Sequence, residues 1–220
     1  ITDSGVLAIT GTSTLTAADE QSIILDQSST FGTVAFVASS GNLKNVTIND
    51  SNAFDLSALT LAKVSSAGGN LTVTAGGAVT NSDTLVIPGT ATISASSQAV
   101  TLNDSSNDFG TATITGANVA VTDTNEIAIG ASTVSGTYSV TADGNITDDG
   151  ALVITGLTTL AAGSGIITLD HTSNDFQGGL IISSSGNVVL RDVGAIDLGA
   201  ATVSGTYSVT AGGAITDSGT

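Results

Sequence analysis

Apolar residues alternate with Ser and Thr in short runs along the chain, as in residues 71–74 (LTVT), 166–169 (IITL) and 187–190 (NVVL). Clusters of Gly, Asn, Asp and Ser end most of these runs. A period of two places the apolar side chains on one side of a strand and the polar ones on the other, and such clusters favour tight turns. β-Branched residues are abundant and no helical period is present. The pattern predicts an all-β chain of short strands without helices.

The sequence also repeats itself. Residues 202–219 read TVSGTYSVTAGGAITDSG, and residues 133–150, which lie 69 positions earlier, read TVSGTYSVTADGNITDDG. A more divergent copy, NLTVTAGGAVTNSD, occupies 70–83, and the chain opens on ITDSG at 1–5. Equivalent apolar positions therefore lie 78, 67 and 69 residues apart, at Ile1, Val79, Ile146 and Ile215. Phenylalanine repeats the first two offsets, at Phe31, Phe109 and Phe176. Three units cover nearly the whole chain, which is typical of repeat architectures.

Within the best-preserved unit, residues 137–156, 157–179 and 180–205 align with one another. Each of these three segments contains a first strand, a Gly-containing turn, a second strand, an Asp and a more variable third part. Three short strands per turn, stacked turn on turn, describe a single-stranded parallel β-helix in which each coil adds about 4.8 Å along the axis. We therefore expect three coils in each unit of 67–78 residues.

Extending this alignment predicts about nine to ten coils in one continuous β-solenoid over residues 1–220. Full coils are expected at 12–33, 34–69, 70–89, 90–111 and 112–136, with partial coils at 1–11 and 206–220. Residues 51–69 make one coil longer than the rest, and we expect them to leave the wall as an insertion loop. A row of small β-sandwiches, each about 70–100 residues long, remains an alternative for this period.

The side chains that point inward are expected to be small or branched, with Phe109 and Phe176 at equivalent places. The predicted inward positions include Val73, Ile93, Ile114, Val140 and Leu160. An interior this narrow is a dry packed core and cannot be a channel.

Charge restricts the possible partners. The 220 residues include 3 Lys plus Arg against 19 Asp plus Glu, which gives a formal net charge of −16. Nucleic acid and anionic membrane surfaces are therefore poor partners. The chain contains no Cys, which excludes disulfides and thiolate metal sites, and no Met, so we expect it to be a piece of a longer protein. No apolar run is long enough to span a bilayer as a helix.

Aspartate follows the second strand of nearly every expected coil, and Asn81 fills the one gap in the series. The candidates for a metal-binding column along one corner are Asp26, Asp50, Asp104, Asp123, Asp148, Asp170, Asp192 and Asp217, with Asp3 at the start of the series. Asp is also a good turn residue, because its side chain bonds its own backbone two residues on. A Ca²⁺ site needs six to eight oxygen ligands. We therefore expect weak Ca²⁺ binding at most and no other cofactor.

Hydroxyl pairs flank the inward residue of the first strand in several coils. They are Thr14 and Thr16, Thr72 and Thr74, Thr92 and Ser94, Thr113 and Thr115, Ser139 and Thr141, and Ser208 and Thr210. A flat hydroxyl face of this kind is suited to a glycan or to ice, but Thr is also simply a soluble strand former.

No catalytic constellation is visible in the sequence. His171 is the only imidazole, beside Asp170 in a variable turn, and we interpret it as an exposed turn residue. The only long cationic side chains are Lys44, Lys63 and Arg191. Neither a Ser/His/Asp triad nor a His-rich metal site can be assembled from these residues. We expect a chain that is not an enzyme, with a carbohydrate-active enzyme as a distant alternative.

The motifs TVSGTYSVTAGGAITDSG, ALVITGLTTLAAG, ITLDHTSNDFQGG and GAIDLGAATVSG resemble repeats of large bacterial surface proteins of the filamentous haemagglutinin type. The resemblance covers nearly the whole chain. It implies a right-handed β-helical shaft in a secreted or surface-displayed adhesin, located outside the cell. Its expected partners are neighbouring repeats, end-to-end or lateral copies, and a host or surface glycan. Two alternatives are a glycan-binding or divalent-cation-binding module and, more distantly, the enzyme.

Overall fold

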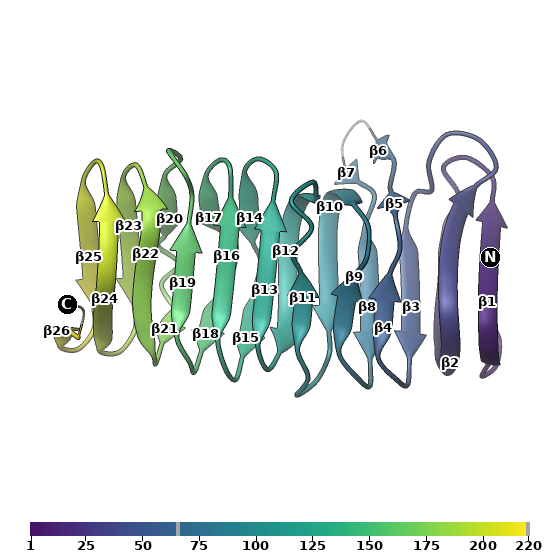
Figure 1. Ribbon diagram of the computed structural model, residues 1–220, viewed down its shortest axis with the longest axis horizontal. Coiled ribbons are helices and arrows are strands. Elements are labelled where there is room, and N and C mark those ends of the chain that lie inside the picture. Colours follow the sequence, from purple (N-terminus) through teal and green to yellow (C-terminus); the bar gives the residue numbers. More distant parts are fainter. Residues whose placement is uncertain (65–66, 219–220) are drawn as a thin grey trace.

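The computed structural model describes residues 1–64 and 67–218, and in it the chain winds into an elongated β-solenoid of about 10 turns. Strand β1 lies at one end of the stack, and β25 and β26 lie at the other (Figure 1). The described residues contain no helix. The all-β parallel solenoid expected from the sequence is therefore confirmed.

Two large parallel sheets form the walls of the solenoid. The 15-stranded sheet contains β1 (Ala8–Ala17), β2 (Ile23–Ala38), β3 (Val46–Asp50), β5 (Leu59–Thr60), β8 (Leu71–Ala75), β10 (Leu85–Ser94), β12 (Asp108–Gly116), β14 (Ile127–Ile129), β15 (Ser132–Val134), β17 (Ile146–Asp148), β18 (Leu152–Ile154), β20 (Ile167–Leu169), β21 (Asp175–Phe176), β23 (Val188–Asp192) and β25 (Tyr207–Ala211). The nine-stranded sheet contains β4 (Phe54–Leu56), β9 (Val79–Asn81), β11 (Val100–Leu102), β13 (Val119–Asp123), β16 (Tyr138–Ala142), β19 (Thr158–Ala161), β22 (Gly179–Ser185), β24 (Ile196–Val203) and β26 (Ile215–Asp217).

Alternation along each strand builds the core. In β16, Tyr138, Val140 and Ala142 point inward and are buried, while Ser139 and Thr141 point outward. Parallel pairing keeps this pattern in register, so that Val140 stacks on Leu160 of the next turn. The expected inward residues are all at most 1% exposed, as are Phe109 and Phe176. One hydrophobic cluster consequently runs through the stack from Ile23 to Ile196.

The walls exclude the alternative of tandem β-sandwiches. Within each of the two large sheets, every pair of neighbouring strands is parallel, as stacked turns require. Among the described strands, only the short hairpin of β6 (Lys63–Val64) and β7 (Ala67–Gly68) is antiparallel.

Each sequence unit spans three and a half turns, and our expectation of three coils per unit was wrong. Tyr138 pairs with Thr158, Thr158 with Leu180 and Leu180 with Leu198, which completes three turns. The repeat of Tyr138 comes nine residues later, at Tyr207 in β25, on the opposite wall. In the second and third units, the additional half turns lie in the coils expected at 112–136 and 180–205, where Ala112 already pairs with Ile129 and Leu180 with Leu198. Identical sequence therefore alternates between the two sheets from unit to unit.

The insertion is shorter than the expected range of 51–69. Within that range, β4 pairs with β9, and β5 pairs with the start of β10, so both belong to the walls. Phe54 and Leu56 are buried in the core. Only the hairpin of β6 and β7 rises from the stack, at the top of Figure 1, and residues 65–66 lie outside the described part.

Glycines permit close approach of successive turns at one corner. Gly136, Gly156 and Gly178 precede β16, β19 and β22, and the N–H of Gly156 donates a 3.0 Å hydrogen bond to the carbonyl of Gly136. A Cβ on Gly156 would lie 2.5 Å from that carbonyl oxygen, and one on Gly178 would lie 2.3 Å from the oxygen of Gly156. The corner therefore has no room for a side chain.

Candidate functional site

The Asp series is divided between two walls, so the single column expected from the sequence does not form. Asp26, Asp50, Asp148 and Asp192 belong to the 15-stranded sheet, with Asp170 just beyond β20. Asp123 and Asp217 belong to the nine-stranded sheet, with Asp104 just beyond β11. The half-turn phase of the repeat causes this division. Within the described residues, no cluster of three or more Asp, Glu or His side chains could hold a metal ion.

Asp50, Asp123 and Asp192 are buried, and each ends a five-residue strand. One carboxylate oxygen of each accepts the backbone N–H of a repeated phenylalanine, with donor–acceptor distances of 3.2 Å for Phe31, 2.7 Å for Phe109 and 2.7 Å for Phe176. The other oxygen accepts the N–H two residues further on, at Asn52, Asn125 and Gly194. These carboxylates join one turn to the next.

Burial shifts the titration of one of these groups. Desolvation raises the pKa of Asp123 to about 6, and the nearby charge of Asp108 raises it further. The hydrogen bonds from Phe109 and Asn125 oppose the shift, because they stabilise the ionised form. Loss of hydration therefore outweighs the two backbone donors at this site.

Asn107 and Asn174 lie two residues before Phe109 and Phe176 and also accept hydrogen bonds at this corner of the solenoid. The sequence analysis did not predict their role. Both side chains are fully buried, and their Oδ1 atoms accept the N–H of Leu85 and of Leu152 at 2.9 Å. Ser29 has the same role in the first unit, where its hydroxyl accepts the N–H of Leu7. The signal available in the sequence was the triplet NDF, which occurs at 107–109 and again 67 residues later at 174–176.

Asp148 accepts hydrogen bonds from the next turn of the solenoid, whereas His171 accepts one from its own loop. Asp148 Oδ1 accepts the N–H of Asp170, and its Oδ2 accepts the side-chain amide of Asn174 at 2.6 Å and the N–H of His171. His171 Nδ1 accepts the N–H of Ser173. Asp104 accepts the N–H of Ser106 in the same way one unit earlier. The turn interpretation of His171 is thus supported, although this residue is half-buried and the sequence had suggested an exposed one.

The hydroxyl pairs form a continuous array over only part of one wall. Thr72, Thr92 and Thr113 stack in register, and beside them stack Thr74, Ser94 and Thr115. The pair of Ser139 and Thr141 lies in the nine-stranded sheet instead. The array therefore spans the neighbouring strands β8, β10 and β12.

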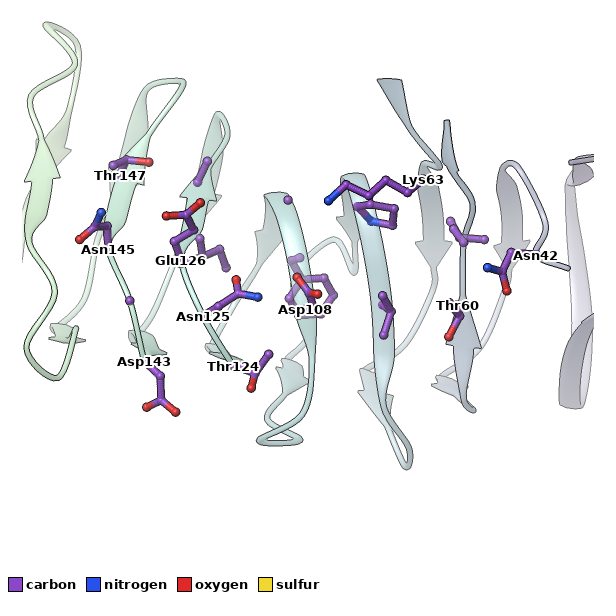
Figure 2. A pocket seen from close by; sticks show the side chains of 18 residues that line it. Asn42, Thr60, Lys63, Asp108, Thr124, Asn125, Glu126, Asp143, Asn145 and Thr147 are labelled. Carbon is purple, nitrogen blue, oxygen red and sulfur yellow. The ribbon is translucent and has the colours of Figure 1, made fainter. Parts of the chain in front are cut away.

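A groove of about 920 Å³ crosses several turns beside the hairpin of β6 and β7 (Figure 2). Its polar lining includes the carboxylates of Asp108, Glu126 and Asp143, the side-chain amides of Asn125 and Asn145, and the ammonium group of Lys63, which Figure 2 shows on the hairpin side. Its apolar lining includes Val86, Pro88 and Phe109. Such a mixture can accept hydrogen bonds from a neutral, hydroxyl-rich ligand.

Sequence reasoning did not predict this groove. Its lining residues lie between Asn42 and Thr147, and only the stacking of turns brings them together. The long coil around residues 51–69 was the one available signal, because Lys63 comes from the hairpin in that coil.

Comparison with known proteins identifies one match. The sequence model of a protein family described as "Repeats of unknown function (DUF5649)" matches residues 1–38, 43–115, 116–183 and 185–220. The matches at 43–115 and 116–183 are close in length to the unit of three and a half turns. The chain matches no curated protein and no solved structure.

Proposed function

We propose that this chain, which belongs to the family described as "Repeats of unknown function (DUF5649)", is a shaft segment of a large bacterial adhesin displayed outside the cell. In this function it extends, stiffens and presents other parts of the protein, and it has no catalytic role. The resemblance of its motifs to filamentous haemagglutinin-type repeats supports the adhesin assignment.

The uninterrupted core is the observation that carries this proposal. Inward residues such as Val121, Val140 and Leu160 stack on one another without a break between units. About 10 turns at about 4.8 Å each give a rod of roughly 50 Å. Because each turn contacts mainly its neighbours, such a rod lengthens in proportion to the number of repeats.

The charge of the chain fits a long exposed rod. A net charge of −16 opposes lateral association of the walls, while neighbouring turns remain joined by backbone hydrogen bonds and core contacts. A shaft needs strong contacts between successive turns along its axis and walls that do not associate with one another.

Two measurements test the proposal. Chains of one, two and three joined copies should increase in maximum dimension linearly in small-angle X-ray scattering, and a compact form would contradict the shaft. Antibodies against the chain should label intact cells of the organism that produces it. Labelling that requires permeabilised cells would contradict display outside the cell.

Binding of a neutral glycan is the second candidate function, and the hydroxyl array on β8, β10 and β12 favours it. Two stacked rows of Thr and Ser form a regular set of donors and acceptors on one wall. A glycan array with Thr92→Val and Thr113→Val tests this function, because Val keeps the shape and removes the hydroxyl group. Thr168→Val, on β20 and outside the array, is the matched control. Equal binding by all of these variants would exclude the array as the site.

A further inference from the structure

The groove beside the hairpin of β6 and β7 runs along the axis of the solenoid. Its lining comes from β5, β10, β12, β14 and β17 and from the turns before β14 and β17. These strands follow one another in the wall, since β5 pairs with β10, β10 with β12, β12 with β14 and β14 with β17. Four steps of about 4.8 Å give a length of about 20 Å. A groove of this length accommodates an extended chain molecule.

Two carboxylates of the groove lie where the other repeat units have no polar side chain. The pairing of β14 with β17 recurs in the first unit as β4 with β9 and in the third as β24 with β26. At the positions of Glu126 and Asp143, these two units carry only alanine or glycine. The equivalent residues are Ala53 and Gly76 in the first unit, and Ala195 and Gly212 in the third. The same strand pairing therefore forms without either carboxylate, so the fold does not require them.

The charged side chains of the groove have no partner within the protein. Among the described residues, no hydrogen bond or ion pair occupies the three carboxylates or the ammonium group of Lys63. Three carboxylates and one ammonium group give the lining a net charge of −2, in a chain whose own net charge is −16. The groove therefore repels an anionic ligand and attracts a cationic one.

The three carboxylates are distributed along the groove. Asp108 lies on β12, Glu126 lies before β14 and Asp143 lies before β17, on three successive turns (Figure 2). In the described part of the chain, no three acidic or imidazole side chains are close enough to hold one metal ion. This arrangement suits a ligand that carries several cationic groups along its length.

The uncharged lining is suited to a sugar chain. The side-chain amide of Asn125 and the hydroxyl groups of Thr60, Thr124 and Thr147 can exchange hydrogen bonds with sugar hydroxyls, and β10 contributes an apolar surface for the face of a ring. A peptide that docks on a sheet uses an open strand edge. Both β10 and β14 have neighbouring strands on both edges, so a peptide backbone finds no such edge here.

From these observations we propose that the groove binds an extended oligosaccharide of hexosamine units with free amino groups. The ammonium groups of the ligand pair with the carboxylates of Glu126 and Asp143, and its hydroxyl groups bond the amides and threonines of the lining. Lys63 lies on the hairpin side, where it donates to a sugar hydroxyl and disfavours an ammonium group. The inference goes beyond the shaft function and concerns other residues than the hydroxyl array.

Isothermal titration calorimetry of the 220-residue chain with a linear glucosamine tetrasaccharide tests the ligand class. The pH is chosen so that the amino groups are protonated and the carboxylates are ionised. The fully N-acetylated tetrasaccharide has the same length without the charges, and spermine has the charges without the sugar rings. We expect the glucosamine tetrasaccharide to bind about tenfold or more tightly than either, the effect of one charge-assisted or several neutral hydrogen bonds.

Paired substitutions test the location of the site. Glu126→Ala with Asp143→Gly introduces residues that the other two units carry, so the variant should fold, and it should lose about tenfold or more in affinity. Asp149→Ala with Asp170→Ala removes the same charge at exposed positions outside the groove and should bind as the native chain does. Thr92→Val with Thr113→Val, in the hydroxyl array, should also leave the affinity unchanged. Circular dichroism confirms that each variant is folded.

Equal affinity for the N-acetylated tetrasaccharide would overturn recognition of the amino groups, and equal affinity for spermine would overturn recognition of the sugar. Unchanged affinity of the groove variant, or equal losses in the groove variant and the Asp149 and Asp170 variant, would overturn the groove as the site. No measurable binding by the native chain would overturn the proposal as a whole. None of these results affects the scattering or the antibody labelling, so failure of this site and failure of the adhesin shaft can be distinguished.

Discussion

The backbone N–H of Phe109 donates a 2.7 Å hydrogen bond to the buried carboxylate of Asp123, which lies in the strand that follows. The pair of Phe176 and Asp192 repeats this bond at the same length. In each pair, the phenylalanine ring is buried in the core, and the hydrogen bond from its backbone to the buried carboxylate joins two successive turns.

Removal of one of these carboxylates should weaken the turn. We expect Asp192→Ala to cost about 3 kcal/mol or more, because the N–H groups of Phe176 and Gly194 lose a charged acceptor. Urea unfolding gives the free energy, and hydrogen exchange should show lost protection at these two amides. Asp170→Ala, at an exposed position, is the control and should change little.

The raised pKa of Asp123 should make stability depend on pH. The pKa of Asp123 is about 6 in the folded chain and 3.8 in the unfolded chain, so the folded chain binds this proton more tightly. The resulting contribution to the free energy of unfolding is fully present below pH 3.8 and is lost as the pH rises through 6. The loss is of order 3 kcal/mol. The difference in unfolding free energy between the native chain and Asp123→Asn should change over this interval. A constant difference between pH 3.5 and 7 would contradict the shift.

The repeated phenylalanines should be important to local stability. Phe176→Ala leaves a cavity in the core and should cost about 3–5 kcal/mol, with the damage limited mainly to neighbouring turns. Hydrogen exchange resolved by peptide should show faster exchange around β18 to β23 and little change near β3. Leu157→Ala, at a 41% exposed position, provides the comparison.

The glycine corner should not accept a methyl group. Gly156→Ala places a Cβ 2.5 Å from the backbone oxygen of Gly136, so the two turns must separate and their 3.0 Å hydrogen bond must lengthen. We expect a lower melting temperature than for Gly11→Ala, where a Cβ would meet no atom within 4 Å. Equal melting temperatures would mean that the corner adjusts without cost.

Calcium should have no specific effect on stability. The Asp residues lie on two walls, and the three buried ones already accept two backbone N–H groups each. We expect equal melting temperatures in Ca²⁺ and Na⁺ at matched ionic strength. A higher value in Ca²⁺, reduced by Asp148→Asn, would reveal a cation site that involves this carboxylate.

The sequence alone determined the kind of fold. Alternation such as that of residues 71–74 specifies which side chains point inward, and the strand periodicity depends only on local backbone geometry. The repeat offsets then favoured a stack of similar turns over a row of β-sandwiches, and they identified Phe109 and Phe176 as buried equivalents.

Only the tertiary structure decided which wall each strand joins. The alternation of apolar and polar residues shows which side chains point inward, but it is the same in both walls. Residues 138–142 and 207–211 both read YSVTA, yet they belong to opposite sheets, and their identical sequences cannot predict this difference. The assignment depends on the number of residues at every corner, which sets the phase of the winding. That phase divided the Asp series and brought Glu126 and Lys63 to one groove.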